Sequence, residues 1–238
     1  MKFHSLIAAA LLYCAASSSH AALIHQFHLN GSLNDSVTGT SLVALGGTPG
    51  ANAYVFNANQ GLRLDAQLGG VYTIDMVFHF DSFRSYGRIV DFHNLNGDDG
   101  LYAAGHAMRL FNVAGTGAGG YLADDVNSRV TLTRDDQKMF RVYQNGELVL
   151  SVNDTTGIAD FGQNVAHFFR DNVVGGASGE ANPGAVDYIR VYNTALSAGE
   201  VRELAPPAAE VAEVREPASF GMVGAGLALL GWTRRRRK

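Results

Sequence analysis

The sequence predicts an all-β protein, a jelly-roll β-sandwich of two antiparallel sheets that ends in one short helix. Three observations predict this fold class. Apolar and polar residues alternate with a period of two in many short segments. Turn signals rich in glycine and asparagine separate nearly all of these segments. No helical periodicity lies between them, so a repeated βαβ arrangement is excluded.

The predicted strands follow one another along a stretch with the length of one sandwich domain. The first strand, residues 23–29, runs into the turn dipeptide Asn30-Gly31, and residues 71–80 form the longest alternating segment. Two segments of β-branched and aromatic residues flank Asn145-Gly146, which is the strongest local signal for a β-hairpin. The other predicted strands are residues 54–56, 88–92, 100–102, 108–111, 129–134, 140–144, 147–152, 166–169 and 185–192.

One helix is predicted after the last strand. Ser197 and Glu200 have the spacing of a capping box, and Pro206-Pro207 end the helix. We therefore place the domain at residues 22–205 and an Ala/Glu/Val-rich linker at residues 206–216.

The first residues have the pattern of a secretory signal peptide, residues 1–21. Lys2 precedes an apolar run, and Ser19-His20-Ala21 places small residues where signal peptidase cleaves, between Ala21 and Ala22. The only cysteine, Cys14, would leave with this peptide, so the mature protein is expected to contain no disulfide.

The last residues, 217–238, form a tail in three parts. A short polar segment is followed by an uncharged run, Ala218 to Trp232, which is shorter than the roughly 20 apolar residues of an ordinary spanning helix. A block of cations, which would stay on the cytoplasmic side of a membrane, closes the chain. The residues of this predicted signal are Glu216, Pro217, Ala218, Ser219, Arg234, Arg235, Arg236 and Arg237.

This tail resembles a PEP-CTERM sorting signal, although Arg215 stands where the family has its first proline. The resemblance implies a Gram-negative bacterium, export across the inner membrane, transient anchoring there by a short transmembrane segment, and processing by an exosortase near Pro217. It implies a final location at the cell surface or in the extracellular matrix. Proteins of this kind are often associated with extracellular polysaccharide or biofilm.

The domain itself resembles a laminin-G-like, concanavalin A-like lectin/glucanase domain. The resemblance is carried by residues 27–36, residues 60–64, the hairpin at residues 142–147 and, most specifically, residues 186–201. It implies two curved sheets with the first and last strands side by side, and a concave face that often binds glycans. It does not identify the glycan.

No catalytic residue is predicted. Glucanases of this fold use closely spaced acidic residues on one strand. The domain offers only Glu147 and Glu180 before the final helix, and neither has a partner at the required spacing. Tyr86, Tyr102, Phe111 and Tyr121 are candidate platforms for sugar stacking, although most aromatic residues of a sandwich fill its core.

A structural Ca²⁺ ion is predicted at Asp35 and Asp187, which lie next to the first strand and on the last strand. Neighbouring strands would bring both carboxylates to one ion, together with backbone carbonyl groups. The alternative is that Asp35 makes an Asx-turn and that Asp187 caps a turn or pairs with Arg190. The histidines of the domain show no recognised zinc-ligand spacing, so we interpret them as scattered, half-buried sandwich residues.

These observations leave three hypotheses for function. The first is an exported, non-catalytic β-sandwich that binds or organises extracellular polysaccharide. The second is a secreted glycan hydrolase or lyase with an atypical arrangement of carboxylates. The third is a structural adhesion protein with a protein partner. The formal net charge of −4, which becomes more negative when both signals are removed, offers no basic face for nucleic acid.

Overall fold

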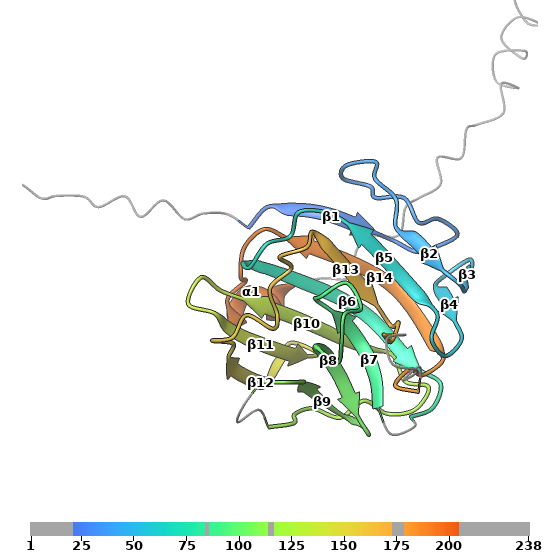
Figure 1. Cartoon of the computed structure of the whole chain (residues 1–238). Coiled ribbons are helices and arrows are strands. Elements are labelled where there is room, and N and C mark those ends of the chain that lie inside the picture. The colour runs from blue at the N-terminus through green and yellow to red at the C-terminus, as the bar shows by residue number, and fades with distance from the viewer. Residues whose placement is uncertain (1–20, 84–85, 114–116, 173–178, 205–238) are drawn as a thin grey trace, which may run out of the picture. The chain divides into compact units, whose positions relative to one another are not determined.

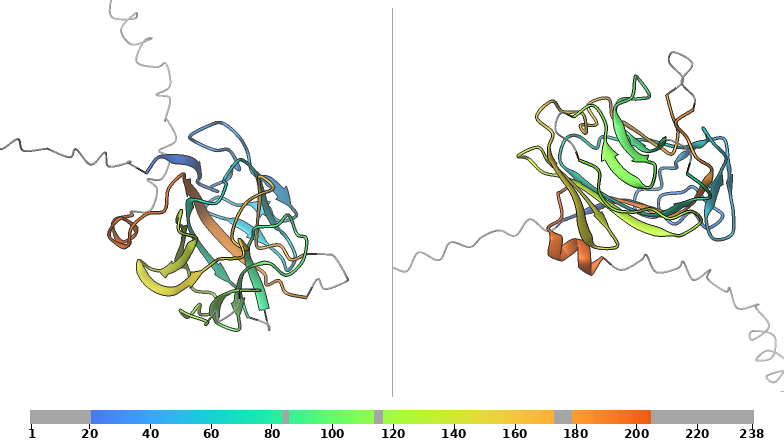
Figure 2. Two further views of the ribbon diagram at one scale, coloured as in Figure 1. Left: turned by 60° about the vertical axis from the view of Figure 1, so that its left-hand side comes forward. Right: turned by 90° about the horizontal axis from the view of Figure 1, so that it is seen from below.

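The computed structural model describes residues 21–83, 86–113, 117–172 and 179–204, and these residues form two antiparallel sheets packed face to face (Figures 1 and 2). The predicted signal peptide up to His20, the linker and the sorting tail lie outside the described residues. Within the described part of the chain, no helix is long and apolar enough to cross a membrane.

The two sheets differ in size. The larger sheet has the path β12-β11-β10-β6-β14-β4-β3, with β1 also paired to β14, and the smaller sheet has the order β2-β5-β13-β7-β8-β9. The strands of the larger sheet are β1 (Leu23–Phe27), β3 (Thr48–Pro49), β4 (Tyr54–Phe56), β6 (Tyr72–Phe80), β10 (Ser128–Arg134), β11 (Met139–Gln144), β12 (Glu147–Asn153) and β14 (Gly184–Tyr192). Those of the smaller sheet are β2 (Val43–Leu45), β5 (Gly61–Asp65), β7 (Tyr86–Asp91), β8 (Gly100–Ala104), β9 (Ala107–Leu110) and β13 (Val165–Phe168).

The all-β prediction is confirmed, and the first and last strands do lie side by side. The first strand is shorter than predicted, because Leu29 has a positive φ of 57° that breaks the extended backbone. The prediction missed β2, β3 and β5. Two of these are only two or three residues long, too short for an alternating pattern to be visible.

The predicted hairpin at Asn145-Gly146 is present between β11 and β12. Its two central residues have φ values of 51° and 89°, so both take the left-handed conformation that a tight type I′ hairpin turn requires. Asparagine and glycine tolerate this conformation best, and the sequence signal therefore has a direct conformational cause.

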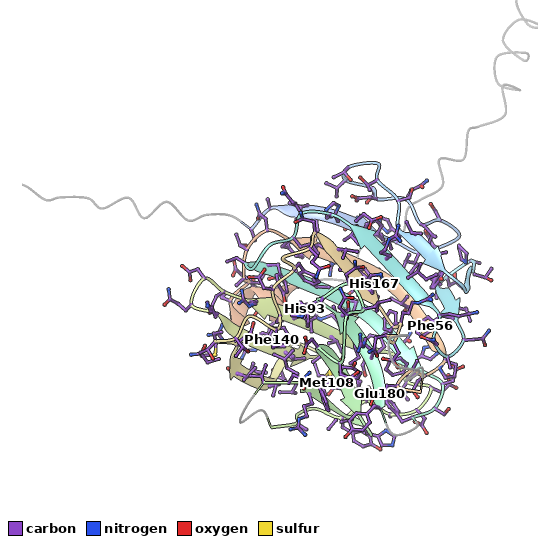
Figure 3. All side chains as sticks on the ribbon, viewed as in Figure 1. Phe56, His93, Met108, Phe140, His167 and Glu180 are labelled. Carbon is purple, nitrogen blue, oxygen red and sulfur yellow. The ribbon has the colours of Figure 1, made fainter. Side chains whose placement is uncertain are left out.

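Aromatic side chains fill the space between the sheets. The ring centroids of Phe56 and Phe169 lie 4.6 Å apart in a stacked arrangement, and those of Phe92 and Phe161 lie 4.9 Å apart. Phe56 and Phe140 are labelled within the sandwich in Figure 3. Burying one such side chain contributes about 1.5–3 kcal/mol to folding, so this core stabilises the domain without a disulfide.

The predicted C-terminal helix is α1 (Ala198–Glu203), and it lies on the outside of the sandwich (Figure 2). The capping box is confirmed, because the Ser197 side chain accepts a hydrogen bond from the Glu200 backbone and the Glu200 side chain accepts one from Ser197. Val201 packs against Tyr143 of β11. The Arg129 guanidinium donates hydrogen bonds to the carbonyl oxygens of Val201 and Leu204, both at 2.5 Å.

A buried polar cluster lies on the same outer face of the larger sheet. Asp75 of β6 stands directly opposite Arg190 of β14, and the Arg190 Nη2 group donates to the Asp75 Oδ2 atom at 2.6 Å. The hydroxyl groups of Tyr188 and Thr131 also donate to Asp75, and the Arg129 Nε atom lies 3.6 Å from its Oδ1 atom. One carboxylate thus organises the surface beside the helix.

Candidate functional site

The two residues predicted to bind calcium occupy different surroundings. The Asp35 carboxylate accepts hydrogen bonds from the Gln26 and Val37 backbone N–H groups and from the Thr38 hydroxyl. Its Oδ2 atom also lies 2.8 Å from the His25 Nδ1 atom. The bond from Val37, two residues on, is the Asx-turn of the alternative interpretation.

Asp187 lies at a bulge of β14, between Val186 and Tyr188, and accepts a hydrogen bond from the Asn127 side chain at 3.0 Å. Asp35 and Asp187 share no hydrogen-bond partner in the described residues. Calcium binding by this pair stays a prediction. The alternative pairing of Asp187 with Arg190 is wrong, because Arg190 bonds to Asp75, its direct cross-strand neighbour.

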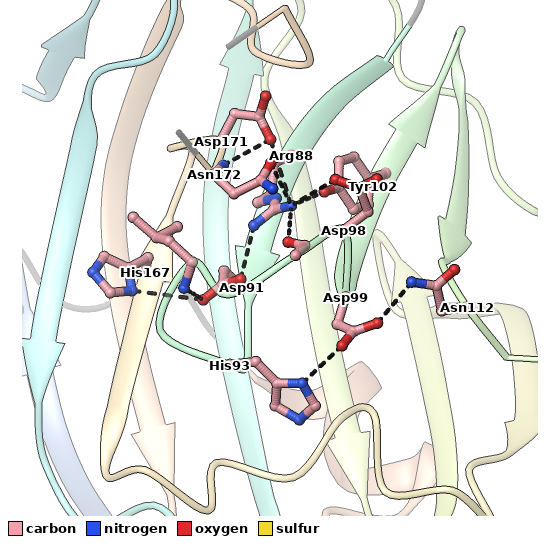
Figure 4. Close-up of polar contacts among 12 residues, drawn as sticks. Arg88, Asp91, His93, Asp98, Asp99, Tyr102, Asn112, His167, Asp171 and Asn172 are labelled. Carbon is pink, nitrogen blue, oxygen red and sulfur yellow. Dashed lines mark hydrogen bonds and ion pairs between the residues drawn. The ribbon is translucent and has the colours of Figure 1, made fainter. Parts of the chain in front are cut away.

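A larger polar assembly lies on the outer face of the smaller sheet. A bulge in β7 between Arg88 and Val90 inserts one extra residue, so that Arg88 and Asp91 both point away from the core, into which Ile89 packs. The strand register places Arg88, Tyr102 and Arg109 in one row across β7, β8 and β9. We call the group Arg88, Asp91, Asp98, Tyr102 and Asp171 the Arg88 network (Figure 4).

Arg88 is completely buried and lies at the centre of this network. Its Nη1 atom donates to Asp91 Oδ2 at 2.8 Å, and its Nη2 atom donates to the Gly97 carbonyl oxygen at 2.8 Å and to the Tyr102 hydroxyl. The Nη2 atom also lies 3.4 Å from Asp171 Oδ1 and 3.9 Å from Asp98 Oδ1. A buried guanidinium needs such partners, and here they come from four segments of the chain.

The network carries more negative than positive charge. Burial raises the pKa of Asp171, although Arg88 and two backbone N–H groups act in the opposite direction. Burial, followed by the nearby Asp171 and Asp98 carboxylates, raises the pKa of Glu180. Asp98, with a side chain that is 47% exposed, offers an acceptor to solvent. The face therefore favours ligand groups that donate hydrogen bonds and disfavours anionic ones.

His167 of β13 extends the network on the other side of Asp91. Its side chain is only 4% exposed, and its Nδ1 atom lies 3.6 Å from Asp91 Oδ1 without a hydrogen-bond partner. The strand register aligns His167 with both Asp91 and Arg63. A polar row thus crosses the middle of the sheet.

Aromatic rings border the Arg88 network on the side of β9. The Phe111 ring lies 5.8 Å from the Tyr86 ring and 5.5 Å from the Tyr102 ring, and the exposed Arg109 guanidinium lies 5.8 Å from its centroid. Tyr86 and Phe111 are half-buried, whereas Tyr102 is buried beneath Arg88. We call Tyr86, Phe111 and Arg109 the aromatic edge.

A cavity of about 310 Å³ opens at the other end of the loop that carries Asp98. It is lined by His93, Asn96, Gly157, Asp160, Gly162 and Gln163. The His93 Nδ1 atom lies 2.9 Å from Asp99 Oδ2, and Asn112, just after β9, donates to Asp99 Oδ1 at 2.7 Å. These bonds fix the loop between the network and the cavity (Figure 4).

The family model for the concanavalin A-like lectin/glucanases superfamily matches residues 49–202, more than half of the chain. The chain belongs to this superfamily. No curated protein matches it in sequence.

Solved structures of the same fold include several glycan-related proteins. The sialidase of Trypanosoma rangeli matches with a TM-score of 0.60 and 16% identity, over 76% of this chain and 32% of the sialidase. Domain 4 of AbnA, a GH43 extracellular arabinanase from Geobacillus stearothermophilus solved with arabinotriose, matches with a TM-score of 0.59 and 17% identity, over 78% of this chain and 99% of that domain. The receptor-binding domain of botulinum neurotoxin type G matches with a TM-score of 0.51 and 15% identity, over 76% of this chain and 50% of the neurotoxin domain. This concanavalin A-like chain thus spans about a third of the length of the sialidase.

Sequence reasoning missed most of this concanavalin A-like domain's outer face. Glu180 has no acidic partner at the required sequence spacing, whereas the fold brings Glu180 beside Asp171 and Asp98. Glu147 is exposed and contacts Arg202 at 3.5 Å. One feature of the sequence indicates the Arg88 network. Arg88 directly precedes the apolar residues Ile89 and Val90, and a charged residue inside an apolar strand requires buried partners.

Proposed function

We propose that this protein is an exported, non-catalytic β-sandwich that binds extracellular polysaccharide through the outer face of its six-stranded sheet. The observation that carries this proposal is the aromatic edge beside the Arg88 network. Tyr86 and Phe111 offer ring surface for a sugar to stack on, and Asp98 and Glu180 offer acceptors for its hydroxyl groups. The buried contacts of Arg88 hold this face in place, so that little order has to be created on binding.

Two of the four carboxyl groups near Arg88 are buried away from any ligand. Hydrolysis requires two carboxyl groups that reach the bond from either side. Asp91 and Asp171 are completely buried and paired with Arg88, so neither can reach a polysaccharide. Asp98 and Glu180 remain accessible, and in the proposal they act as hydrogen-bond acceptors.

One of the fold relatives supports the proposal. The arabinanase domain, solved with arabinotriose, is matched over nearly its whole length, so a unit of this size can exist as a separate glycan-associated domain. Its sequence identity of 17% transfers the fold and leaves the ligand open.

A glycan array, followed by calorimetry with the strongest binder, tests the proposal. Phe111→Ala should lower the affinity about tenfold, which corresponds to about 1.4 kcal/mol of lost stacking and apolar contact. Val55→Ala is the control, since Val55 is 54% exposed on β4 of the other sheet and should leave the affinity unchanged. Binding to no polysaccharide on the array, or equal affinities for the two variants, would contradict the proposal.

We further propose that the chain is sorted to the cell surface by the two signals at its ends, with signal peptidase and an exosortase as processing partners. The Ala22 backbone N–H donates to the Asn193 side chain at 3.1 Å, and Asn193 donates back to the Ala22 carbonyl oxygen. Cleavage before Ala22 would therefore keep the domain whole. The fifteen or so uncharged residues of the tail are short for a permanent anchor.

Intact-mass analysis of the protein from its native envelope tests this sorting. The expected mass is that of a chain that starts at Ala22 and ends near Pro217, with or without an attached group at the new C-terminus. Replacing Arg234–Lys238 by neutral residues serves as the matched control and should leave the C-terminal tail uncut. A native protein that retains Lys238 would show that the tail is not removed.

A further inference from the structure

A histidine and two aspartates converge where β6 ends. His79 is the last outward-facing residue of β6, Asp81 follows two positions later, and Asp125 comes from the loop before β10. The His79 Nε2 atom lies 3.5 Å from Asp81 Oδ1 and 3.7 Å from Asp125 Oδ1. Among the described residues, this is the one group of three or more His, Cys, Asp or Glu side chains with ligand atoms within 4.8 Å of one another.

A chain of side-chain hydrogen bonds outside this group determines that the Nδ1 atom of the His79 ring carries a hydrogen. Asn127 donates its Nδ2 hydrogen to Asp187 Oδ2 at 3.0 Å, which leaves its Oδ1 atom as the acceptor that faces His79. The His79 Nδ1 atom lies 2.7 Å from this Oδ1 atom, so Nδ1 must carry the hydrogen. In the neutral ring, Nε2 then presents its lone pair to the two carboxylate oxygens.

With a neutral His79 ring, the Nε2 lone pair and the Asp81 and Asp125 carboxylate oxygens face one another with no positive charge between them. A lone pair that faces two carboxylates at 3.5 and 3.7 Å is unfavourable unless a cation or a proton lies between them. The His79 ring also resembles metal-binding histidines in its other nitrogen. In such histidines the second ring nitrogen donates a hydrogen bond to an oxygen that orients the ring. Here the orienting groups are Asn127 and, behind it, Asp187.

We infer that His79, Asp81 and Asp125 bind a divalent transition-metal cation of the Zn²⁺ type. Ligand bonds of about 2.0–2.2 Å in a tetrahedral site place neighbouring ligand atoms about 3.4 Å apart, close to the two separations seen here. Two carboxylates and one neutral imidazole balance the charge of one such ion. The side chains of Asp81 and Asp125 are 57% and 82% exposed, so the fourth position is open to water or to a group on another molecule.

The site gives Asp187 a role other than the predicted one. Asp187 does not face the proposed ion but holds Asn127, which in turn holds His79. The loop that carries Asp125 is tied to β6 by a backbone hydrogen bond of 2.8 Å from Asp125 to the Phe80 carbonyl oxygen. The Asn127 contact thus orients the His79 ring, and the bond to Phe80 places the backbone of Asp125 beside it.

Titration of the full, untagged chain with Co²⁺ at pH 7.5 tests the site, since tetrahedral Co²⁺ absorbs visible light. We expect one saturable equivalent with such a spectrum and its displacement by Zn²⁺. Asp125→Asn should weaken binding at least tenfold, and Asn127→Ala, which removes only the orienting group, should weaken it about tenfold. Asp136→Asn removes an exposed carboxylate from the turn between β10 and β11 and should change nothing.

Two results would overturn the inference. One is the absence of any saturable Co²⁺ binding, which would mean that His79, Asp81 and Asp125 hold no metal ion. The other is binding that is equal in the wild type, Asp125→Asn and Asp136→Asn, which would place the ion elsewhere on the chain. Both results are independent of polysaccharide binding, because the site lies on the larger sheet.

Discussion

Replacing Arg88 by methionine should lower the free energy of unfolding by about 3–5 kcal/mol. The side chain is completely buried, and its removal leaves the buried Asp91 and Asp171 carboxylates without their counter-charge. Methionine keeps most of the volume, so the loss comes from the charges rather than from a cavity. Urea-induced unfolding at pH 7, followed by circular dichroism, measures the difference.

Arg109→Met is the matched control for this variant. Arg109 occupies the same cross-strand row on β9 but is exposed, so its replacement should change the stability by less than about 0.5 kcal/mol. The loss of unfolding free energy caused by Arg88→Met should also become smaller as the pH falls from 7 to 4. Burial raises the folded-state pKa of Asp171 even beside Arg88, and the variant loses the opposing effect of the guanidinium, so protonation of Asp171 at lower pH favours the folded variant. Equal losses of unfolding free energy in Arg88→Met and Arg109→Met at pH 7 would contradict this account of the network.

Asp75→Ala should have the second large effect, again about 3–5 kcal/mol. It removes the shared acceptor of Arg190, Tyr188 and Thr131 and leaves a buried guanidinium uncompensated. It also frees Arg129, which holds the carbonyl oxygens at the end of α1. We therefore expect global destabilisation in urea together with faster amide hydrogen exchange in Ala198–Glu203.

Asp136→Ala serves as the control here, since it removes an exposed carboxylate from a turn that flanks the same sheet. It should alter neither the unfolding midpoint nor the exchange of α1. If Asp75→Ala lowers the stability but leaves the exchange of α1 relative to the rest of the domain unchanged, the proposed link from Asp75 through Arg129 to the helix is wrong.

The strands could be predicted because their causes are local. Alternation along Tyr72–Phe80, the Asn145-Gly146 turn and the Ser197–Glu200 capping box each depend on residues close together in sequence. The side-by-side position of β1 and β14 is a long-range feature, and it was predicted from the family resemblance, not from periodicity.

The candidate site could not be predicted in the same way. Arg88 and Asp171 lie 83 positions apart and meet only because a bulge turns Arg88 outward. His79 and Asp125 likewise meet through a loop whose course no local pattern specifies. The alternative pairing of Asp187 with Arg190 was wrong for a related reason. It was based on their closeness in sequence along β14, whereas the register with β6 places Asp75 directly opposite Arg190.

The central position of β14 has a mechanical consequence. Force applied at Leu204 passes through α1 and reaches β14, which is flanked by β6 on one side and by β1 and β4 on the other. The inter-strand hydrogen bonds of an antiparallel pair run perpendicular to the strands, so tension along β14 shears the bonds on both of its sides together. A domain tethered through its C-terminal end would therefore transmit tension to a strand that is paired on both sides, after the helix and its Arg129 contacts have yielded.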